Sequence, residues 1–214
     1  MWLDVLTKVK EILATERDDA ELDKFLSEVR ESLTASNRQF LQYSALIVGS
    51  LVTYHLLVYG GSKAISLNGV QLTDTTLFRR VFLIFPAALL AAMASVGYLR
   101  RLQRAVFDCL VISRYPILAR AGLHELRLPG DFTLGLFVLG EVGGVPGRMV
   151  RGVVGFLCVV AFIFAPTAYV LTESIKNIQV FGLNDVLCLT ASVGAILVSV
   201  SSFLIVHLAG RIRP

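Results

Sequence analysis

Four stretches of the chain contain no Asp, Glu, Lys or Arg and are rich in aliphatic side chains. They cover approximately residues 40–60, 81–99, 152–171 and 186–210. About 20 apolar residues in a helix are enough to cross the hydrocarbon core of a bilayer. The pattern therefore predicts an all-α fold, a polytopic membrane bundle of four transmembrane helices arranged as two hairpins.

Segment 1–39 is polar and shows helical periodicity. Its apolar residues form two stripes, one of Trp2, Val5, Leu6, Val9, Ile12 and Leu13 and one of Leu22, Phe25, Leu26, Val29, Leu33 and Phe40. Two helices that each carry one apolar stripe can cover each other. We therefore expect an N-terminal cytoplasmic amphipathic helical hairpin that leads straight into the first span. Alternatively, the stripes pack between subunits as a short coiled coil.

Two short stretches between the spans, 63–70 and 176–183, align without a gap and share Lys, Ile and Gly at equivalent positions. In the first, apolar residues alternate with polar ones around Asn68-Gly69, which is the strongest short signal for a β-hairpin. The pattern predicts two outer turns, at 61–73 and 172–185. It also suggests a duplicated unit of span, turn and span. The alternative is that turn chemistry alone selects glycine at both sites.

The spans carry small residues at four-residue spacing, which permits close packing of helices in a membrane. Ala45, Gly49 and Thr53 follow this spacing in the first span, and Ala195 and Ser199 do so in the fourth. Pro86 lies in the first half of the second span. A proline inside a helix removes a hydrogen-bond donor and clashes with the preceding turn, so we expect a kink there.

Segment 100–151 carries most of the basic residues near the spans. It begins with a predicted amphipathic helix that has Arg100, Arg101 and Arg104 on its polar side, and a loop rich in Gly and Pro follows. Cytoplasmic loops are enriched in Lys and Arg, so we expect both termini and this segment in the cytoplasm. The expected location is a cell membrane, plasma or bacterial inner, with multiple crossings.

The chain therefore divides into five predicted parts. They are a cytoplasmic helical hairpin (1–39), a first transmembrane hairpin (40–99), a cytoplasmic basic helix and loop (100–151), a second transmembrane hairpin (152–210) and a basic tail (211–214).

We find no motif for a catalytic, cofactor or metal site. Cys109, Cys158 and Cys188 match no zinc spacing. His55 and His207 lie in spans, but the predicted topology places them at opposite depths, which argues against haem ligation within one subunit. The formal net charge of +4 is modest and is not clustered as a nucleic-acid surface would be. The middle of each span lacks ionisable residues, which disfavours an ion-coupled pump.

Two sets of side chains remain as candidates for function. Ser199, Ser201, Ser202 and Thr53 form a candidate pore or helix-packing face, with hydrogen bonds that stabilise the bundle as the favoured interpretation. Arg100, Arg101, Arg104, Arg79 and Arg80 are candidate lipid-head contacts, although setting the topology or anchoring a helix at the interface is the favoured role.

The function expected from these patterns is that of a non-enzymatic integral membrane protein. We expect it to associate with itself and to act as an anchor, scaffold or sensor through its cytoplasmic helices. The expected partners are the lipid bilayer, further copies of the chain and a cytoplasmic protein that binds residues 1–39. The alternative is an oligomeric channel or membrane-permeabilising effector.

Overall fold

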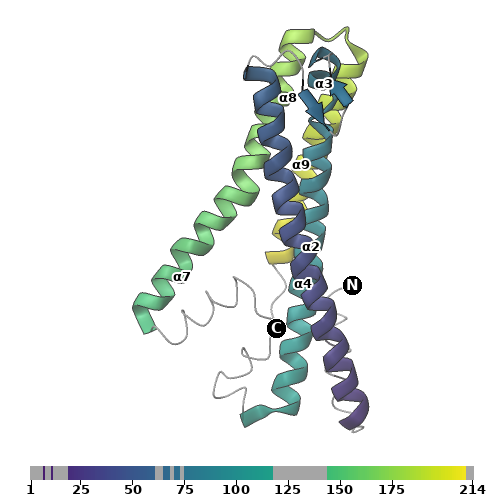
Figure 1. The fold of residues 1–214 in the computed structure, drawn as a ribbon. Coiled ribbons are helices and arrows are strands. Elements are labelled where there is room, and N and C mark those ends of the chain that lie inside the picture. Colours follow the sequence, from purple (N-terminus) through teal and green to yellow (C-terminus); the bar gives the residue numbers. More distant parts are fainter. Residues whose placement is uncertain are drawn as a thin grey trace. The chain divides into compact units, whose positions relative to one another are not determined.

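The computed structural model describes Thr7, Glu11 and residues 19–60, 65–67, 70–72, 75–117 and 144–210. The elements in chain order are α2 (Asp19–Tyr59), β1 (Ile65–Leu67), β2 (Val70–Leu72), α3 (Thr75–Val81), α4 (Ile84–Arg114), α7 (Gly144–Val159), the π-helix η2 (Val160–Phe164), α8 (Ala165–Phe181) and α9 (Val186–Gly210) (Figure 1). The first helix of the predicted N-terminal hairpin and most of the Gly/Pro-rich loop lie outside the described residues.

The described part of the chain contains four helical segments that are long and apolar enough to cross a membrane. They run over Ala20–Tyr59, Thr76–Arg114, Val145–Phe181 and Val186–His207. Each contains one of the four predicted apolar stretches, so the prediction of a helical multi-pass membrane protein is confirmed at this level. Three of the segments are far longer than the predicted spans.

The chain divides into two compact units. Unit 1 comprises Met1–Phe40, Val96–Cys158 and Val206–Pro214, and unit 2 comprises Leu41–Ser95 and Val159–Ile205. In unit 1, the N-terminal half of α2 packs against the C-terminal half of α4 around Val29, Leu33, Phe107, Leu110 and Val111. Gln103 bonds with Ser32 (2.6 Å) and Ser36 (2.9 Å) beside this core.

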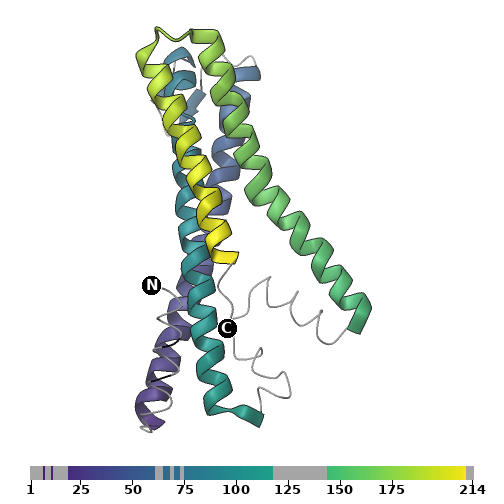
Figure 2. The same ribbon diagram turned by 180° about the vertical axis from the view of Figure 1, so that it is seen from behind.

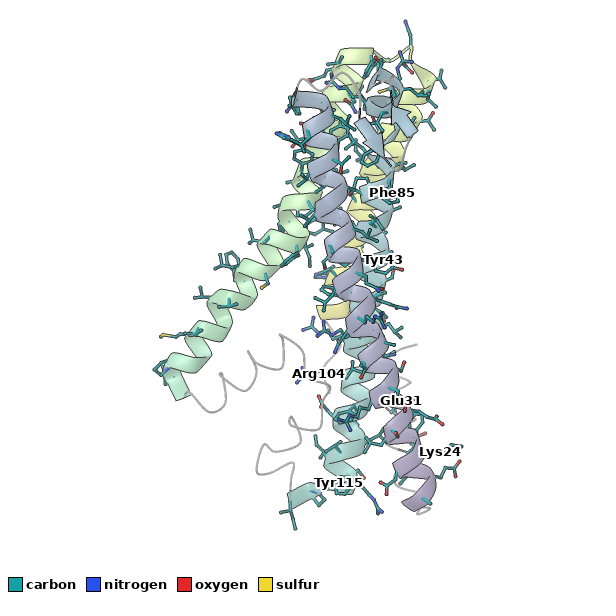
Figure 3. The ribbon with its side chains drawn as sticks, in the orientation of Figure 1. Lys24, Glu31, Tyr43, Phe85, Arg104 and Tyr115 are labelled. Atoms are coloured by element: carbon teal, nitrogen blue, oxygen red, sulfur yellow. The ribbon has the colours of Figure 1, made fainter. Side chains whose placement is uncertain are left out.

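The second apolar stripe of segment 1–39 therefore has a described partner in α4. Val29 and Leu33 are buried and Leu22 and Leu26 are partly buried against this partner, whereas Phe25 from the same stripe is exposed. Near the start of α2, Asp23 contacts Arg114, the last residue of α4, and Tyr115, which follows it. Figure 3 shows Lys24 and Glu31 on α2, and Arg104 and Tyr115 at the α4 side of unit 1.

Unit 2 contains the rest of α2 together with β1, β2, α3, the start of α4, η2, α8 and α9 as far as Ile205. The second predicted span is interrupted, because α3 ends at Val81 and α4 begins at Ile84. The break includes Phe82, which lies four residues before Pro86. In a continuous helix the ring of Pro86 would clash with the carbonyl of Phe82, and here that carbonyl accepts a hydrogen bond from the N–H of Phe85. The π-helix η2 likewise directly precedes the helix that has Pro166 in its first turn.

The buried face of α9 consists of small side chains. Cys188, Ser192, Ala195, Ser199 and Ser202 follow one another at spacings of four and three residues and are all buried. That spacing keeps one side of a helix toward its neighbours. Leu90 and Met93 on α4 are also buried, and the hydroxyl of Ser44 on α2 lies 3.3 Å from the sulfur of Met93.

The two matching stretches of sequence adopt different structures. In the first, β1 and β2 pair antiparallel with Ile65 opposite Leu72, which is the small β-like turn that the alternation predicts. In the second, α8 continues to Phe181, so the turn before α9 is much shorter than the predicted 172–185. Gly182 ends the helix with a φ of 79°, a backbone conformation that favours glycine. The matching stretches therefore differ in their described structure, which gives no support for a duplication.

Candidate functional site

One end of unit 2 gathers polar side chains from four helices. α3, the end of α8 and the start of α9 meet the end of α2 there (Figures 1 and 2). We call the group of Tyr54, Tyr59, Arg79, Glu173, Lys176 and Asn177 the Asn177 cluster. The sequence of α8 explains its position, because Val170, Glu173 and Asn177 recur at three- and four-residue spacing and thus share one helical face. That face is buried in unit 2.

Asn177 is fully buried, and its amide is bonded on both sides. Its Oδ1 accepts from Nε of Arg79 at 3.0 Å, and its Nδ2 donates to the backbone carbonyl of the same residue at 2.8 Å. The hydroxyl of Tyr54 lies 3.1 Å from Nδ2 and 3.3 Å from Oδ1. Because α3 ends at Val81, its last carbonyl groups lack hydrogen-bond donors within the helix. The amide of Asn177 is the donor for one of them, the carbonyl of Arg79.

Glu173 forms the second part of the cluster, one helical turn earlier on α8. Its side chain is only 3% exposed. The hydroxyl of Tyr59 donates to Oε2 at 2.8 Å, and Nζ of Lys176 lies 2.8 Å from Oε1. A buried carboxylate is stable only when it is paired and hydrogen-bonded, and these two contacts provide both conditions.

A second ion pair joins α3 to the start of α9. Nε of Arg80 lies 2.9 Å from Oδ2 of Asp185. Oδ1 of Asp185 accepts from the backbone N–H of Cys188 at 3.0 Å, which caps the N-terminus of α9. The guanidinium groups of Arg79 and Arg80 lie over the ring of Phe181, 5.7 and 5.0 Å from its centroid.

Aromatic rings surround this polar network. The Tyr54 ring lies 6.5 Å or less from the rings of Phe78, Phe82 and Tyr169. Nδ1 of His55 is 3.0 Å from the hydroxyl of Tyr169, on the exposed side of the network. Tyrosine and histidine rings with polar tips are typical of the level at which a membrane protein meets the head groups.

The arrangement connects helices of unit 2. Hydrogen bonds join α2 and α3 to α8, and the ion pair between Arg80 and Asp185 joins α3 to the start of α9. The ion pair between Glu173 and Lys176 lies within α8. Among the residues that the structure describes, no group of three or more His, Cys, Asp or Glu side chains is placed to hold a metal ion. Satisfied polar networks of this kind rigidify a structure and specify one arrangement of its helices.

The structure separates the five predicted lipid-contact arginines. Arg79 and Arg80 contact protein groups in unit 2, as described above. In unit 1, the Arg100 guanidinium lies 5.6 Å from the centroid of the Phe40 ring, and Arg104 lies 3.9 Å from Asp108. Arg101 is exposed.

The predicted hydroxyl face is also divided. Ser199 and Ser202 are buried on α9, whereas Ser201 points to the exposed side of the same helix. Ser201 and Ser202 both donate to the carbonyl of Val198, and Thr53 donates to the carbonyl of Gly49, all within their own helices. These bonds satisfy the hydroxyl groups locally and do not link helices.

Sequence reasoning missed Asn177, Glu173 and Asp185 as members of a site. They fell within the predicted outer turn 172–185, where polar residues would be expected to face water. The candidate span that includes α8 extends through Phe181 instead, so Glu173 and Lys176 lie within it. The available signal was the helical spacing of Val170, Glu173 and Asn177, which continues the period of the preceding span.

A comparison of the chain with protein-family models, curated proteins and solved structures found no match. The functional interpretation therefore depends on the residues and contacts described above. Those contacts point to a connection between helices inside a membrane protein.

Proposed function

We propose that the chain is a non-enzymatic integral membrane protein that acts as an anchor, scaffold or sensor through its cytoplasmic helices. In this proposal the four spans form two hairpins, and the N-terminal amphipathic segment and the basic segment after the second span lie in the cytoplasm. The chain associates with itself in a plasma or bacterial inner membrane. Residues 1–39 are the surface for a cytoplasmic protein partner.

The observation that carries the proposal is the unbroken course of α2. This single helix includes 41 residues and contributes to both units. A helix of that length extends about 60 Å, roughly twice the thickness of the hydrocarbon core. A partner that binds the polar end of α2 therefore binds the same helix that carries Tyr54 and Tyr59 of the Asn177 cluster. This favours an anchoring or sensing role.

The orientation in the proposal is supported by charge. Arg100, Arg101, Arg104 and Arg114 all belong to the end of α4 that packs in unit 1. An excess of Arg and Lys beside a span favours the cytoplasmic side. By contrast, Arg79 and Arg80 are engaged with Asn177 and Asp185, so their charge is partly balanced by the protein.

Self-association is tested by measuring the oligomeric state of the full chain in lipid nanodiscs and in liposomes, by chemical crosslinking and mass. Phe25 is a large apolar side chain exposed on α2 beside the polar residue Lys24. We expect the wild type to form a defined oligomer and Phe25→Glu to shift it toward the monomer. Lys24→Glu is the matched control and should leave the oligomer unchanged. A wild type that stays monomeric at every protein-to-lipid ratio would refute self-association.

The second candidate is an oligomeric channel, and the buried hydroxyl of Ser199 favours it. Its Oγ has no hydrogen-bond partner within the described residues, unlike those of its neighbours Ser201 and Ser202. If the protein conducts ions through liposome membranes, Ser199→Leu should abolish the flux while Ser201→Leu preserves it. Absence of flux in any oligomeric state would refute the channel.

A further inference from the structure

The short turn between α8 and α9 exposes an apolar surface. Val180, Leu183, Val186 and Leu187 form it, and we call these four residues the tip surface. Leu183 is 71% exposed and Val186 is 73% exposed, although both are large aliphatic residues. Exposed apolar side chains that gather in one place mark a contact with a partner or with lipid.

The tip surface carries no unbalanced charge. Asp185 is the only acidic or basic residue between Val180 and Leu187. Its carboxylate is bound by Arg80 and by the backbone N–H of Cys188. A turn that projects into water usually presents charged side chains, whereas this one directs its carboxylate back into the protein and exposes the neutral Asn184.

The tip surface continues the outer face of α9. Val186, Val193, Leu197, Val200 and Leu204 are all exposed, at spacings of seven, four, three and four residues. This spacing places them on one side of the helix, opposite the buried small residues. In a helix that crosses a membrane, an exposed aliphatic face of this kind contacts the lipid chains. The face begins at the first residue of α9, directly beside Leu183, so lipid is the occupant that continuity indicates.

We propose that the tip surface is a lipid-contact surface and that the bilayer covers the α8–α9 turn. The turn lies at the depth of the head groups, where its polar backbone groups still find hydrogen-bond partners. The Asn177 cluster then lies within the membrane, because Asn177 and Glu173 precede the tip on α8. Ionisable groups at such a depth are held by partners inside the protein, which matches the pairing of Glu173.

The inference goes beyond the scaffold function and does not depend on it. It uses only the crossing of the membrane by α8 and α9. It also moves the outer boundary of the third span from residue 171 to the turn itself, in agreement with the extent of the apolar helix Val145–Phe181.

The test uses tryptophan fluorescence in phosphatidylcholine vesicles whose lipids carry bromine at known depths. The chain has a single tryptophan, so Trp2→Phe provides a silent background for the full-length protein. Leu183→Trp reports on the tip surface. Val186→Trp reports on the same surface and replaces Leu183→Trp if that variant does not fold. Leu197→Trp is the control in the middle of the outer face of α9, and Lys24→Trp is the control on the polar face of α2.

We expect brominated lipid to reduce the emission of Leu183→Trp about as strongly as that of Leu197→Trp. Bromine near the head group should be more effective than bromine at the chain end for the tip, and the reverse should hold for Leu197→Trp. Red-shifted emission that resembles Lys24→Trp would overturn the inference, because the tip would face water. Blue-shifted emission without quenching would also overturn it, because protein would cover the tip. Absence of quenching at Leu197→Trp would overturn the assignment of α9 to the membrane together with the inference.

Discussion

Replacement of Asn177 by leucine is the sharpest test of the polar cluster. Leucine has the same branched arrangement of side-chain heavy atoms as asparagine and is somewhat larger, so Asn177→Leu removes the amide and leaves no cavity. The change deprives three groups of their partner: the Nε–H and the backbone carbonyl of Arg79, and the hydroxyl of Tyr54. All three are then left beside an apolar side chain in a fully buried position.

The size of the effect follows from those three groups. A hydrogen bond between membrane helices contributes about 0.6 kcal/mol on average, and one from a charged donor contributes about 1.5–3 kcal/mol. One of the three partners of Asn177 is the charged guanidinium of Arg79. We therefore expect the free energy of unfolding to fall by about 3 kcal/mol, with the cost concentrated in unit 2.

The measurement is reversible unfolding in mixed micelles, followed by circular dichroism, with the protein otherwise unchanged. Asn184→Leu is the matched control, because Asn184 is exposed in the turn before α9. Tyr54→Phe removes one partner and, combined with Asn177→Leu, closes a double-mutant cycle. The double variant should lose less stability than the two single variants together. An effect of Asn177→Leu no larger than that of Asn184→Leu would refute a stabilising role for the amide.

Three further predictions concern other contacts. Glu173→Gln keeps a bond to Tyr59 but removes the attraction to Lys176, so the variant should be less stable than the wild type in the same unfolding assay. The difference should change little between low and high salt, because the carboxylate is only 3% exposed. Gly182→Ala should lower the free energy of unfolding by about 1–3 kcal/mol, because its φ of 79° and ψ of 168° are essentially restricted to glycine. No atom crowds a Cβ at this site, so the loss comes from the backbone alone. The control is Gly49→Ala, which is inside a helix and equally uncrowded and should raise the free energy of unfolding by about 0.5–1 kcal/mol. Gln103→Leu should reduce protection from hydrogen exchange in α2 residues of unit 1 and leave unit 2 unchanged, since its bonds lie in unit 1.

The apolar stretches predicted the membrane helices because the relevant physics is local. A run such as 186–210 is long enough to cross a bilayer whatever surrounds it, and the structure has one helix there. The β-hairpin was equally predictable, since Asn68-Gly69 and the flanking alternation determine it within eight residues. Pro86 likewise indicated an interruption of the second span.

The polar cluster was not predictable in the same way because it is made by contacts distant in sequence. Tyr54 and Asn177 are 123 residues apart, and nothing in either local sequence identifies the other. When only the local sequence is considered, polar residues that follow an apolar run indicate the end of a span. Here the helix continues through Glu173 and Lys176 because the carboxylate of Glu173 is bound by the hydroxyl of Tyr59 and by the ammonium group of Lys176. The same reasoning explains why the contact between Arg79 and Asn177 on α8 was not predicted.

The way in which Asn177 holds Arg79 bears on which substitutions the protein tolerates. One of the two bonds goes to the main chain of residue 79, so it survives any replacement of that side chain except one that displaces the helix end. A saturation library scored for membrane expression should therefore accept many residues at position 79 and very few at position 177. The two positions contact each other directly, yet the information that defines the contact resides almost entirely in one of them.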